Sequence, residues 1–178
     1  MDLTEIKISS EEIFDGKILK VHRDQVKLPN GKTSSREVVD HPGAVSIVAL
    51  DDDKNIYLVR QFRYPVNKVL LEVPAGKLDG GEDPLDCAKR ELAEEVGVAA
   101  SEWQKILTFY TTPGFSNEIM HAFLAKGLTP HIEDKDEDEF LEVIKIPLKD
   151  AVNKILKGEI QDAKTISSIL AVAYTLDT

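Results

Sequence analysis

The sequence predicts a mixed α+β layer fold in which strands outnumber helices. Residues typical of strands fill the first half of the chain, whereas helical periodicity is confined to one central segment and two late ones. The length of 178 residues is enough for one domain with a substantial core and too short for two ordinary domains. We therefore expect one principal domain.

Strands are predicted where polarity alternates or β-branched residues gather. In the first half they cover residues 5–8, 18–28, 33–39, 45–50 and 56–63. Turns are expected at 28–31 and 51–55, where Pro, Asn, Gly and Asp gather. Later strands are expected at 105–110, 119–124 and 140–146.

A central helix is predicted over residues 83–96, where four apolar residues recur at the spacing of one helix face. These residues are Leu85, Ala88, Leu92 and Val96. A loop is expected before the helix at 74–81, and Gly97 is a natural C-terminal stop. Two amphipathic segments, 148–156 and 165–176, close the chain as helices.

Composition and charge exclude several classes of protein. Hydrophobic residues make up 42% of the chain, so it is neither disordered nor fibrous. The formal net charge of -10 opposes binding to nucleic acid and to anionic membrane surfaces. The longest apolar stretch, at 44–50, is too short to span a bilayer, and the first residues do not resemble a secretion signal. Together with a single cysteine, Cys87, these features lead us to expect a cytoplasmic protein with no membrane or nucleic acid partner.

The residues that carry chemistry gather at 76–98, which we call the box segment. On a helix Glu91 and Glu95 lie one turn apart, with Glu94 beside them and Arg90 next along. Carboxylates this close repel one another unless cations lie among them, and a hard divalent cation would offset the charge that Arg90 leaves uncompensated. The alternative is a solvated acidic helix face, which most glutamate clusters are.

The spacing within the box segment resembles the Nudix box. That pattern reads Gly, five residues, Glu, seven residues, Arg-Glu, an aliphatic residue, one residue, Glu-Glu, one residue, Gly and an aliphatic residue. The matching residues here are Gly76, Glu82, Arg90, Glu91, Leu92, Glu94, Glu95, Gly97 and Val98. The resemblance implies the Nudix fold, an α/β/α sandwich around a mixed β-sheet. It also implies metal-dependent hydrolysis of a nucleoside diphosphate linked to another group.

Carried over by position, the resemblance implies roles within the box segment. The implied Mg²⁺ ligands are Glu91 and Glu95 as the main pair, Glu94 as a ligand or the holder of a metal-bound water, and the backbone carbonyl of Ala75. Mn²⁺ is a possible substitute for Mg²⁺. Glu82 and Arg90 would form a charge pair that ties the loop to the helix.

Substrate clues lie outside the box segment. Pro113 stands in the sequence PGFSNE, at an offset from the box that resembles the ADP-ribose pyrophosphatase group of the family. On that interpretation, Gly114 lets the backbone approach a ligand closely, and Glu118 accepts hydrogen bonds from ribose hydroxyls. The alternative is an ordinary surface turn, which Pro-Gly pairs usually form.

The resemblance to this group extends over most of the chain. Further matching stretches are 13–16, 28–32, 36–37, 41–44, 59–63 and 158–165. By position, Arg36 resembles an arginine that stacks on adenine, and Arg63 one that holds the diphosphate with help from Arg60. The alternative for Arg60 and Arg63 is surface charge on a strand. The aromatic partner of the base is not placed, with Phe14 as a candidate.

The resemblance also implies a homodimer. In relatives the first strands are exchanged between two subunits, so we expect residues 1–42 to form a β-strand extension and 43–178 the hydrolase domain.

The acidic stretch at 133–139 has two interpretations. It resembles the segment where ADP-ribose hydrolases keep a mobile catalytic glutamate, which takes a proton from the attacking water. Glu139 is the first choice for this base and Glu137 the second. The alternative is a solvated loop without a catalytic role.

Cys87 and Trp103 are expected to pack, and the four histidines share no metal-binding spacing. The sequence thus predicts hydrolysis of ADP-ribose to AMP and ribose 5-phosphate. A pyrophosphatase for another nucleoside diphosphate sugar, such as GDP-mannose, is the alternative, and a non-catalytic nucleotide sensor is a further one.

Overall fold

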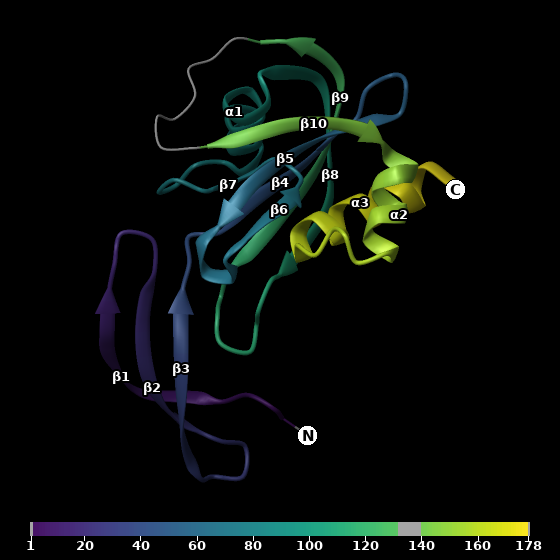
Figure 1. Cartoon of the computed structure of the whole chain (residues 1–178). Coiled ribbons are helices and arrows are strands. Elements are labelled where there is room, and N and C mark those ends of the chain that lie inside the picture. The colour runs from purple at the N-terminus through teal and green to yellow at the C-terminus, as the bar shows by residue number, and fades with distance from the viewer. Residues whose placement is uncertain (1, 132–139, 178) are drawn as a thin grey trace. The chain divides into compact units, whose positions relative to one another are not determined.

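The computed structural model describes residues 2–131 and 140–177. Its Cα positions fall into two compact units (Figure 1). The N-terminal unit comprises Met1–Gly43 and Tyr110–Ile119, and the main unit comprises Ala44–Phe109 and Met120–Thr178. Strands predominate, and the described part of the main unit contains three α-helices, which confirms the predicted α+β class.

The N-terminal unit is an antiparallel sheet in the order β1-β2-β3. Its strands are β1 (Ile6–Asp15), β2 (Lys20–Lys27) and β3 (Thr33–Asp40). The 110–119 segment joins β3, because the Val39 N–H donates to the Phe115 carbonyl at 2.7 Å. The strand expected at 5–8 continues to Asp15, since it pairs with β2 over that length despite two register shifts.

The described residues of the main unit contain two sheets. One has the order β10-β5-β6 and is built from β10 (Leu141–Pro147), β5 (Asn55–Arg63) and β6 (Lys68–Glu72). The other has the order β7-β4-β9-β8 and is built from β7 (Ala75–Lys77), β4 (Ala44–Ala49), β9 (Ile119–Pro130) and β8 (Val98–Tyr110). It is mixed, because β4 runs parallel to β9 and antiparallel to β7.

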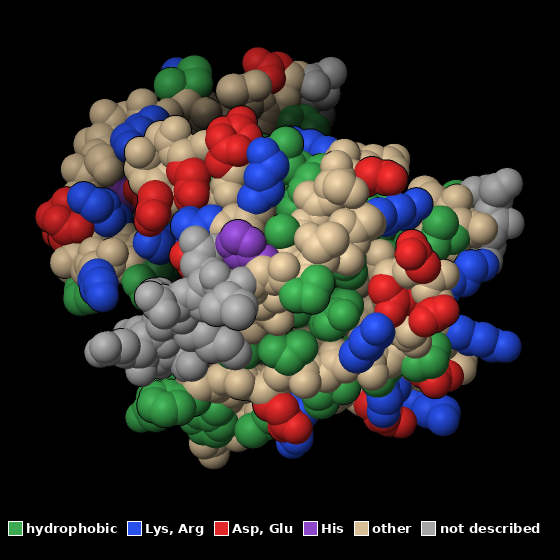
Figure 2. Space-filling model, turned by 90° about the horizontal axis from the view of Figure 1, so that it is seen from above, with side chains coloured by type: hydrophobic (Ala, Val, Ile, Leu, Met, Phe, Trp, Pro, Cys, Tyr) green, Lys and Arg blue, Asp and Glu red, His purple; other side chains and the backbone are tan. Residues whose placement is uncertain are grey.

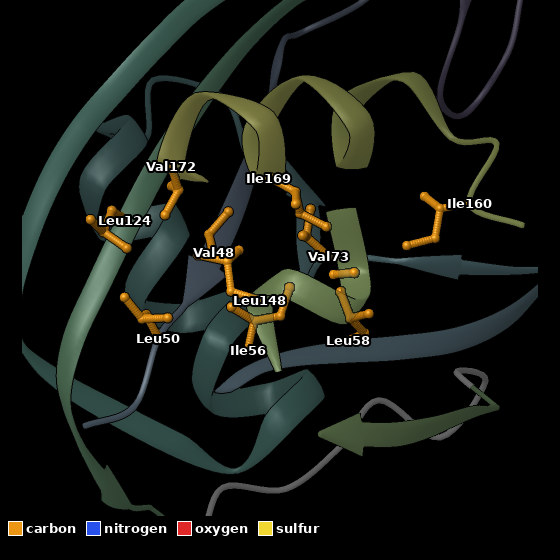
Figure 3. Close-up of a cluster of buried hydrophobic side chains, with 11 residues drawn as sticks. Val48, Leu50, Ile56, Leu58, Val73, Leu124, Leu148, Ile160, Ile169 and Val172 are labelled. Carbon is orange, nitrogen blue, oxygen red and sulfur yellow. The ribbon is translucent and has the colours of Figure 1, made fainter. Parts of the chain in front are cut away.

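Strand β4 is buried on both faces, and its alternate side chains enter two different cores. Val45 and Ile47 pack with Leu92 of α1 (Pro84–Val96). Val48 packs on the other side with Ile169. Figure 3 shows this second cluster, to which α2 (Leu148–Leu156) and α3 (Ala163–Asp177) both contribute. Helices therefore cover both faces of the mixed sheet, which confirms the expected α/β/α arrangement.

Helix α1 begins and ends as the sequence predicts. Asp83 is its N-cap and accepts a hydrogen bond from the Leu85 N–H at 2.8 Å, with Pro84 in the first turn. Gly97 ends the helix at φ +76°, a left-handed conformation that favours glycine, and its N–H donates to the Ala93 carbonyl. The two C-terminal helices also lie where they were expected.

The prediction of an unbroken loop at 74–81 is wrong. Ala75–Lys77 forms β7, whose Gly76 lies opposite Val45 of β4. Strand β6 was not predicted, and β8 is longer than the expected 105–110. A strand of three residues is too short to show alternating polarity in the sequence. Strand β7 is defined instead by its hydrogen-bonded pairing with β4.

No helix in residues 2–131 and 140–177 combines the length and apolarity needed to cross a membrane. On the face shown in Figure 2, acidic and basic side chains are interspersed.

Candidate active site

Pairing of β7 with β4 holds the start of the box segment against α1. Gly76 lies where a Cβ atom would stand 1.8 Å from Cδ of Glu91, so any side chain there would force the Glu91 carboxylate or the β7 backbone to move. The carboxylate of Glu91 therefore occupies the space that the glycine leaves. One helical turn later, Glu95 is buried, and its Oε2 accepts a hydrogen bond from the Ala75 N–H at 3.0 Å.

Arg90 lies at the centre of the other box carboxylates. Its Nε and Nη2 donate to the two oxygens of Glu82 at 3.1 and 3.2 Å. Its Nη1 lies 2.8 Å from Oε1 of Glu91 and 2.9 Å from Oε2 of Glu94. The guanidinium thus joins the loop residue Glu82 to two carboxylates of α1. We call Glu82, Arg90, Glu91, Glu94 and Glu95 the box cluster.

The electrostatics of the box cluster follow from this geometry. The hydrogen bond from Arg90 lowers the pKa of Glu82 from 4.5 to about 2, although partial burial opposes the shift. The same bond raises the pKa of Arg90 above its ordinary value. Both groups stay charged at neutral pH.

The box cluster suits a hard divalent cation. The box cluster holds one arginine against four glutamates, three of which contact that arginine. Carboxylate and carbonyl oxygens are the donors that Mg²⁺ and Mn²⁺ prefer. Within the described residues, no three His, Cys, Asp or Glu side chains converge in metal-binding geometry. The chemistry of the donors fits a cation, while Glu91 and Glu94 are turned toward Arg90 and Glu95 toward the Ala75 amide.

Arg63 ends β5 and forms a two-point ion pair with Glu72, the last residue of β6. Nε and Nη2 of Arg63 each lie 2.8 Å from an oxygen of Glu72. This bond raises the pKa of Arg63, and the negative charges of Asp162 and Glu95 raise it further. Arg60 forms an exposed pair with Glu142 at 2.8 Å. Because Arg60 and Arg63 are three residues apart on one strand, their side chains leave opposite faces.

Sequence reasoning missed Glu72 and Lys164 as residues of this region. Lys164 also donates to Glu72, whose side chain is only 1% exposed. A lone glutamate within the apolar run VLLEV was the signal for Glu72, and the match at 158–165 was the signal for Lys164.

The remaining predicted substrate residues lie in the N-terminal unit. Arg36 forms a two-point pair with Glu5, at 2.9 Å from Nε and 2.5 Å from Nη2. Pro113 and Gly114 lie in the 110–119 segment, where Gly114 has open space around it. At the end of that segment Glu118 accepts a hydrogen bond from the Thr111 hydroxyl. Phe14, the candidate aromatic partner of the base, is exposed.

Glu137 and Glu139, the two candidates for the general base, lie outside the described residues.

The structure confirms the packing roles expected for Cys87 and Trp103. Cys87 is fully buried in the core between α1 and the sheet. Burial, and then the charges of Glu91 and Glu82, raise the pKa of its thiol from 9.0 to about 12. Trp103 packs edge-on against Phe123 with ring centres 6.4 Å apart.

Two family models match consecutive parts of the chain. The model described as NUDIX domain matches residues 40–169. The model described as nucleoside diphosphate sugar hydrolase N-terminal domain matches residues 5–39.

Curated relatives match over nearly the whole chain. An ADP-ribose pyrophosphatase from Bacillus subtilis is 48% identical over 94% of this chain and 91% of its own length. A methanol dehydrogenase activator from Bacillus methanolicus is 44% identical over 94% and 90%. A GDP-mannose pyrophosphatase from Cronobacter sakazakii is more distant, at 30% over 93% and 91%.

The crystal structure of an ADP compounds hydrolase matches the fold of this chain with a TM-score of 0.88. The match covers 99% of this chain and 97% of the hydrolase chain, at 23% sequence identity.

Proposed function

This chain belongs to the NUDIX family, and we propose that it hydrolyses the diphosphate of ADP-ribose to AMP and ribose 5-phosphate. Water supplies the oxygen added at the cleaved diphosphate bond, so each product carries one phosphate. The 48% identity to an ADP-ribose pyrophosphatase supports this substrate over GDP-mannose, whose pyrophosphatase is 30% identical.

The observation that carries the proposal is the box cluster itself. Gly76 leaves room for the Glu91 carboxylate, and Arg90 holds Glu82, Glu91 and Glu94 on one guanidinium. A solvated acidic helix face needs neither a glycine that leaves space for one carboxylate nor an arginine that contacts three of them. The arrangement supports a site in which carboxylates are kept charged and oriented.

For the metal we propose Mg²⁺, with Mn²⁺ as a possible substitute. Glu91 and Glu95 would be the main ligands, joined by Glu94 directly or through water and by the carbonyl of Ala75. Bound there, the cation would supply positive charge against the diphosphate and acidify a water molecule. Arg90 orients its neighbours, so its loss should harm catalysis by displacing Glu91 and Glu94.

For the substrate we propose that Arg63 holds the diphosphate. Its planar guanidinium suits a two-point contact with phosphate oxygens. The assisting role predicted for Arg60 does not fit, because its side chain leaves the opposite face of β5 and pairs with Glu142.

Arg36 would stack on the adenine. Pro113 would mark a substrate loop, in which Gly114 lets the backbone approach the ligand and Glu118 accepts hydrogen bonds from ribose hydroxyls. Glu139, or else Glu137, would take the proton of the attacking water.

We also propose a homodimer in which residues 1–42 are exchanged between subunits, and a cytoplasmic location. Exposed apolar side chains on β1 support the dimer.

The test measures the rate at which the protein hydrolyses the phosphate linkage of each compound in a panel. The panel holds ADP-ribose, GDP-mannose, UDP-glucose, NADH and diadenosine polyphosphate. We expect a preference for ADP-ribose that disappears when the metal is chelated. Preferred turnover of another compound would keep the mechanism and reject the substrate. A folded chain that binds nucleotide and turns over none of them would favour the sensor.

Glu95→Gln is the matched variant for the metal. It should abolish metal-dependent turnover and leave the fold intact by circular dichroism. Near-normal turnover by this variant would reject Glu95 as a ligand.

A further inference from the structure

A buried ionic network links the end of β5, the end of β6 and the start of α3. We infer that Glu72 and Lys164 are positioning residues that orient the guanidinium of Arg63 toward the substrate diphosphate. The inference rests on the proposed function, in which Arg63 binds that diphosphate. It assigns a role to the 158–165 stretch, which the proposed chemistry leaves without one.

One side of the Arg63 guanidinium is held by hydrogen bonds, and the other side is available to a ligand. Nε and Nη2 are held by Glu72, whose side chain is 1% exposed, whereas the side chain of Arg63 is 41% exposed. Among the described residues, Nη1 of Arg63 has no hydrogen-bond acceptor. The fixed edge therefore determines which way the remaining N–H groups point.

Charge explains why Lys164 is needed beside Arg63. Burial alone would raise the pKa of Glu72, but the hydrogen bond from Arg63 and the charge of Lys164 lower it, so Glu72 stays ionised. If Arg63 were its sole counter-ion, an anionic substrate would compete with Glu72 for the same positive charge. With Lys164 in contact, Glu72 stays compensated while Arg63 also faces a phosphate.

The start of α3 fixes Lys164 in turn. Oδ2 of Asp162 lies 3.1 Å from Nζ of Lys164 and accepts hydrogen bonds from the Thr165 N–H and hydroxyl at 3.0 and 2.6 Å. The Thr165 hydroxyl oxygen accepts from the buried Val73 N–H at 2.9 Å. Val73 directly follows Glu72, so α3 secures both the lysine and the strand end that carries the carboxylate.

The experiment measures the Kd for ADP-ribose by calorimetry in the presence of a chelator, together with kcat and KM in Mg²⁺. Lys164→Met should raise the Kd about tenfold, because Glu72 would then compete with the diphosphate for the positive charge of Arg63. KM should rise more than kcat falls, and Lys164→Arg should recover most of the affinity. Lys154→Met, which removes a surface lysine paired with Glu159, is the matched control and should match wild type.

A double-mutant cycle separates positioning from a general structural role. In an Arg63→Ala background, Lys164→Met should have no further effect on the Kd. An unchanged Kd for Lys164→Met alone, or an equal loss in both backgrounds, would overturn the inference. If Lys164→Met does not fold by circular dichroism, Lys164→Gln is measured by the same criteria.

Failure of the proposed function is distinguished from failure of this inference by the wild-type protein alone. Wild-type protein that neither binds nor hydrolyses ADP-ribose would reject the proposed function before any variant is compared.

Discussion

At the scale of single residues, the position of the Glu91 carboxylate depends on the absence of a side chain at Gly76. An alanine there would place its Cβ 1.8 Å from Cδ of Glu91, so the carboxylate or the β7 backbone must move. Misplacing a catalytic group by about 1 Å lowers turnover by about 100-fold. We therefore expect Gly76→Ala to reduce kcat for ADP-ribose by about that factor, measured at saturating Mg²⁺.

Gly80→Ala is the control for this prediction. Nothing lies within 4 Å of a Cβ at Gly80, so its kcat should match wild type. Equal kcat values for wild type and Gly76→Ala would show that turnover does not depend on the present position of the Glu91 carboxylate.

Cys87 is expected to be unreactive in the folded protein. Burial raises the pKa of its thiol to about 12, and the reactive form of cysteine is the thiolate. The native protein at pH 8 should therefore resist iodoacetamide, while the unfolded protein in guanidinium chloride should be alkylated fully. Mass spectrometry of the intact chain measures both, and rapid labelling of the native protein would contradict the buried position.

At the scale of elements, the helices could be predicted from sequence and two of the strands could not. The apolar face of α1, its cap Asp83 and its stop Gly97 are local signals within one stretch of chain. Strand β7 has no such signal, because its pairing partner β4 lies some thirty residues earlier and only folding brings them together. Since β7 carries Ala75 and Gly76, the missed strand is also the one that positions the box segment.

The ion pair between Glu82 and Arg90 ties the loop before α1 to the helix. Because the pKa of Glu82 falls from 4.5 to about 2 on folding, its charged form stabilises the folded state. That stabilisation is complete above pH 4.5 and is lost as the pH falls toward 2. Glu82→Gln should lower the free energy of unfolding at pH 7 by about 1 kcal/mol, since the pair is only partly buried.

Thermal unfolding followed by circular dichroism from pH 7 to pH 2 tests this pH dependence. The difference in melting temperature between wild type and Glu82→Gln should shrink below pH 4.5. Glu102→Gln, at an exposed position on β8, should melt like wild type at pH 7. A difference between wild type and Glu82→Gln that stays constant down to pH 2 would exclude the linkage.

At the scale of the whole molecule, the sequence predicted the box chemistry better than the surroundings of the site. The box residues lie within one segment whose spacing is itself the signal. Glu72 and Lys164 are 92 residues apart, and neither is informative until β6 and α3 are packed together. Arg36 and Glu5 are likewise joined only by the pairing of the N-terminal strands. Contacts of that kind depend on tertiary structure, which no local pattern records.

The N-terminal unit also bears on the assembly of the whole molecule. Every residue of β1 is exposed, and several of them are large and apolar: Ile6, Ile8, Ile13 and Phe14. Exposed apolar side chains gathered on one strand are typical of a surface that another chain covers. If a second copy covers β1, as we propose, a charge placed there should weaken the dimer without unfolding the monomer.

Ile8→Lys tests the dimer with Ser9→Lys as its matched control. Ile8 is 56% exposed in the single chain, so lysine there should leave the monomer folded. Burying an isoleucine at an interface contributes about 1.5–3 kcal/mol, so its loss should raise the dimer dissociation constant about 10- to 100-fold. Sedimentation velocity over a concentration series measures that constant. Ser9→Lys adds the same charge at the adjacent residue without removing apolar surface, and it should change the dimer dissociation constant far less. A wild-type chain that sediments as a monomer at every concentration would reject the dimer and leave the exposed face of β1 without an occupant.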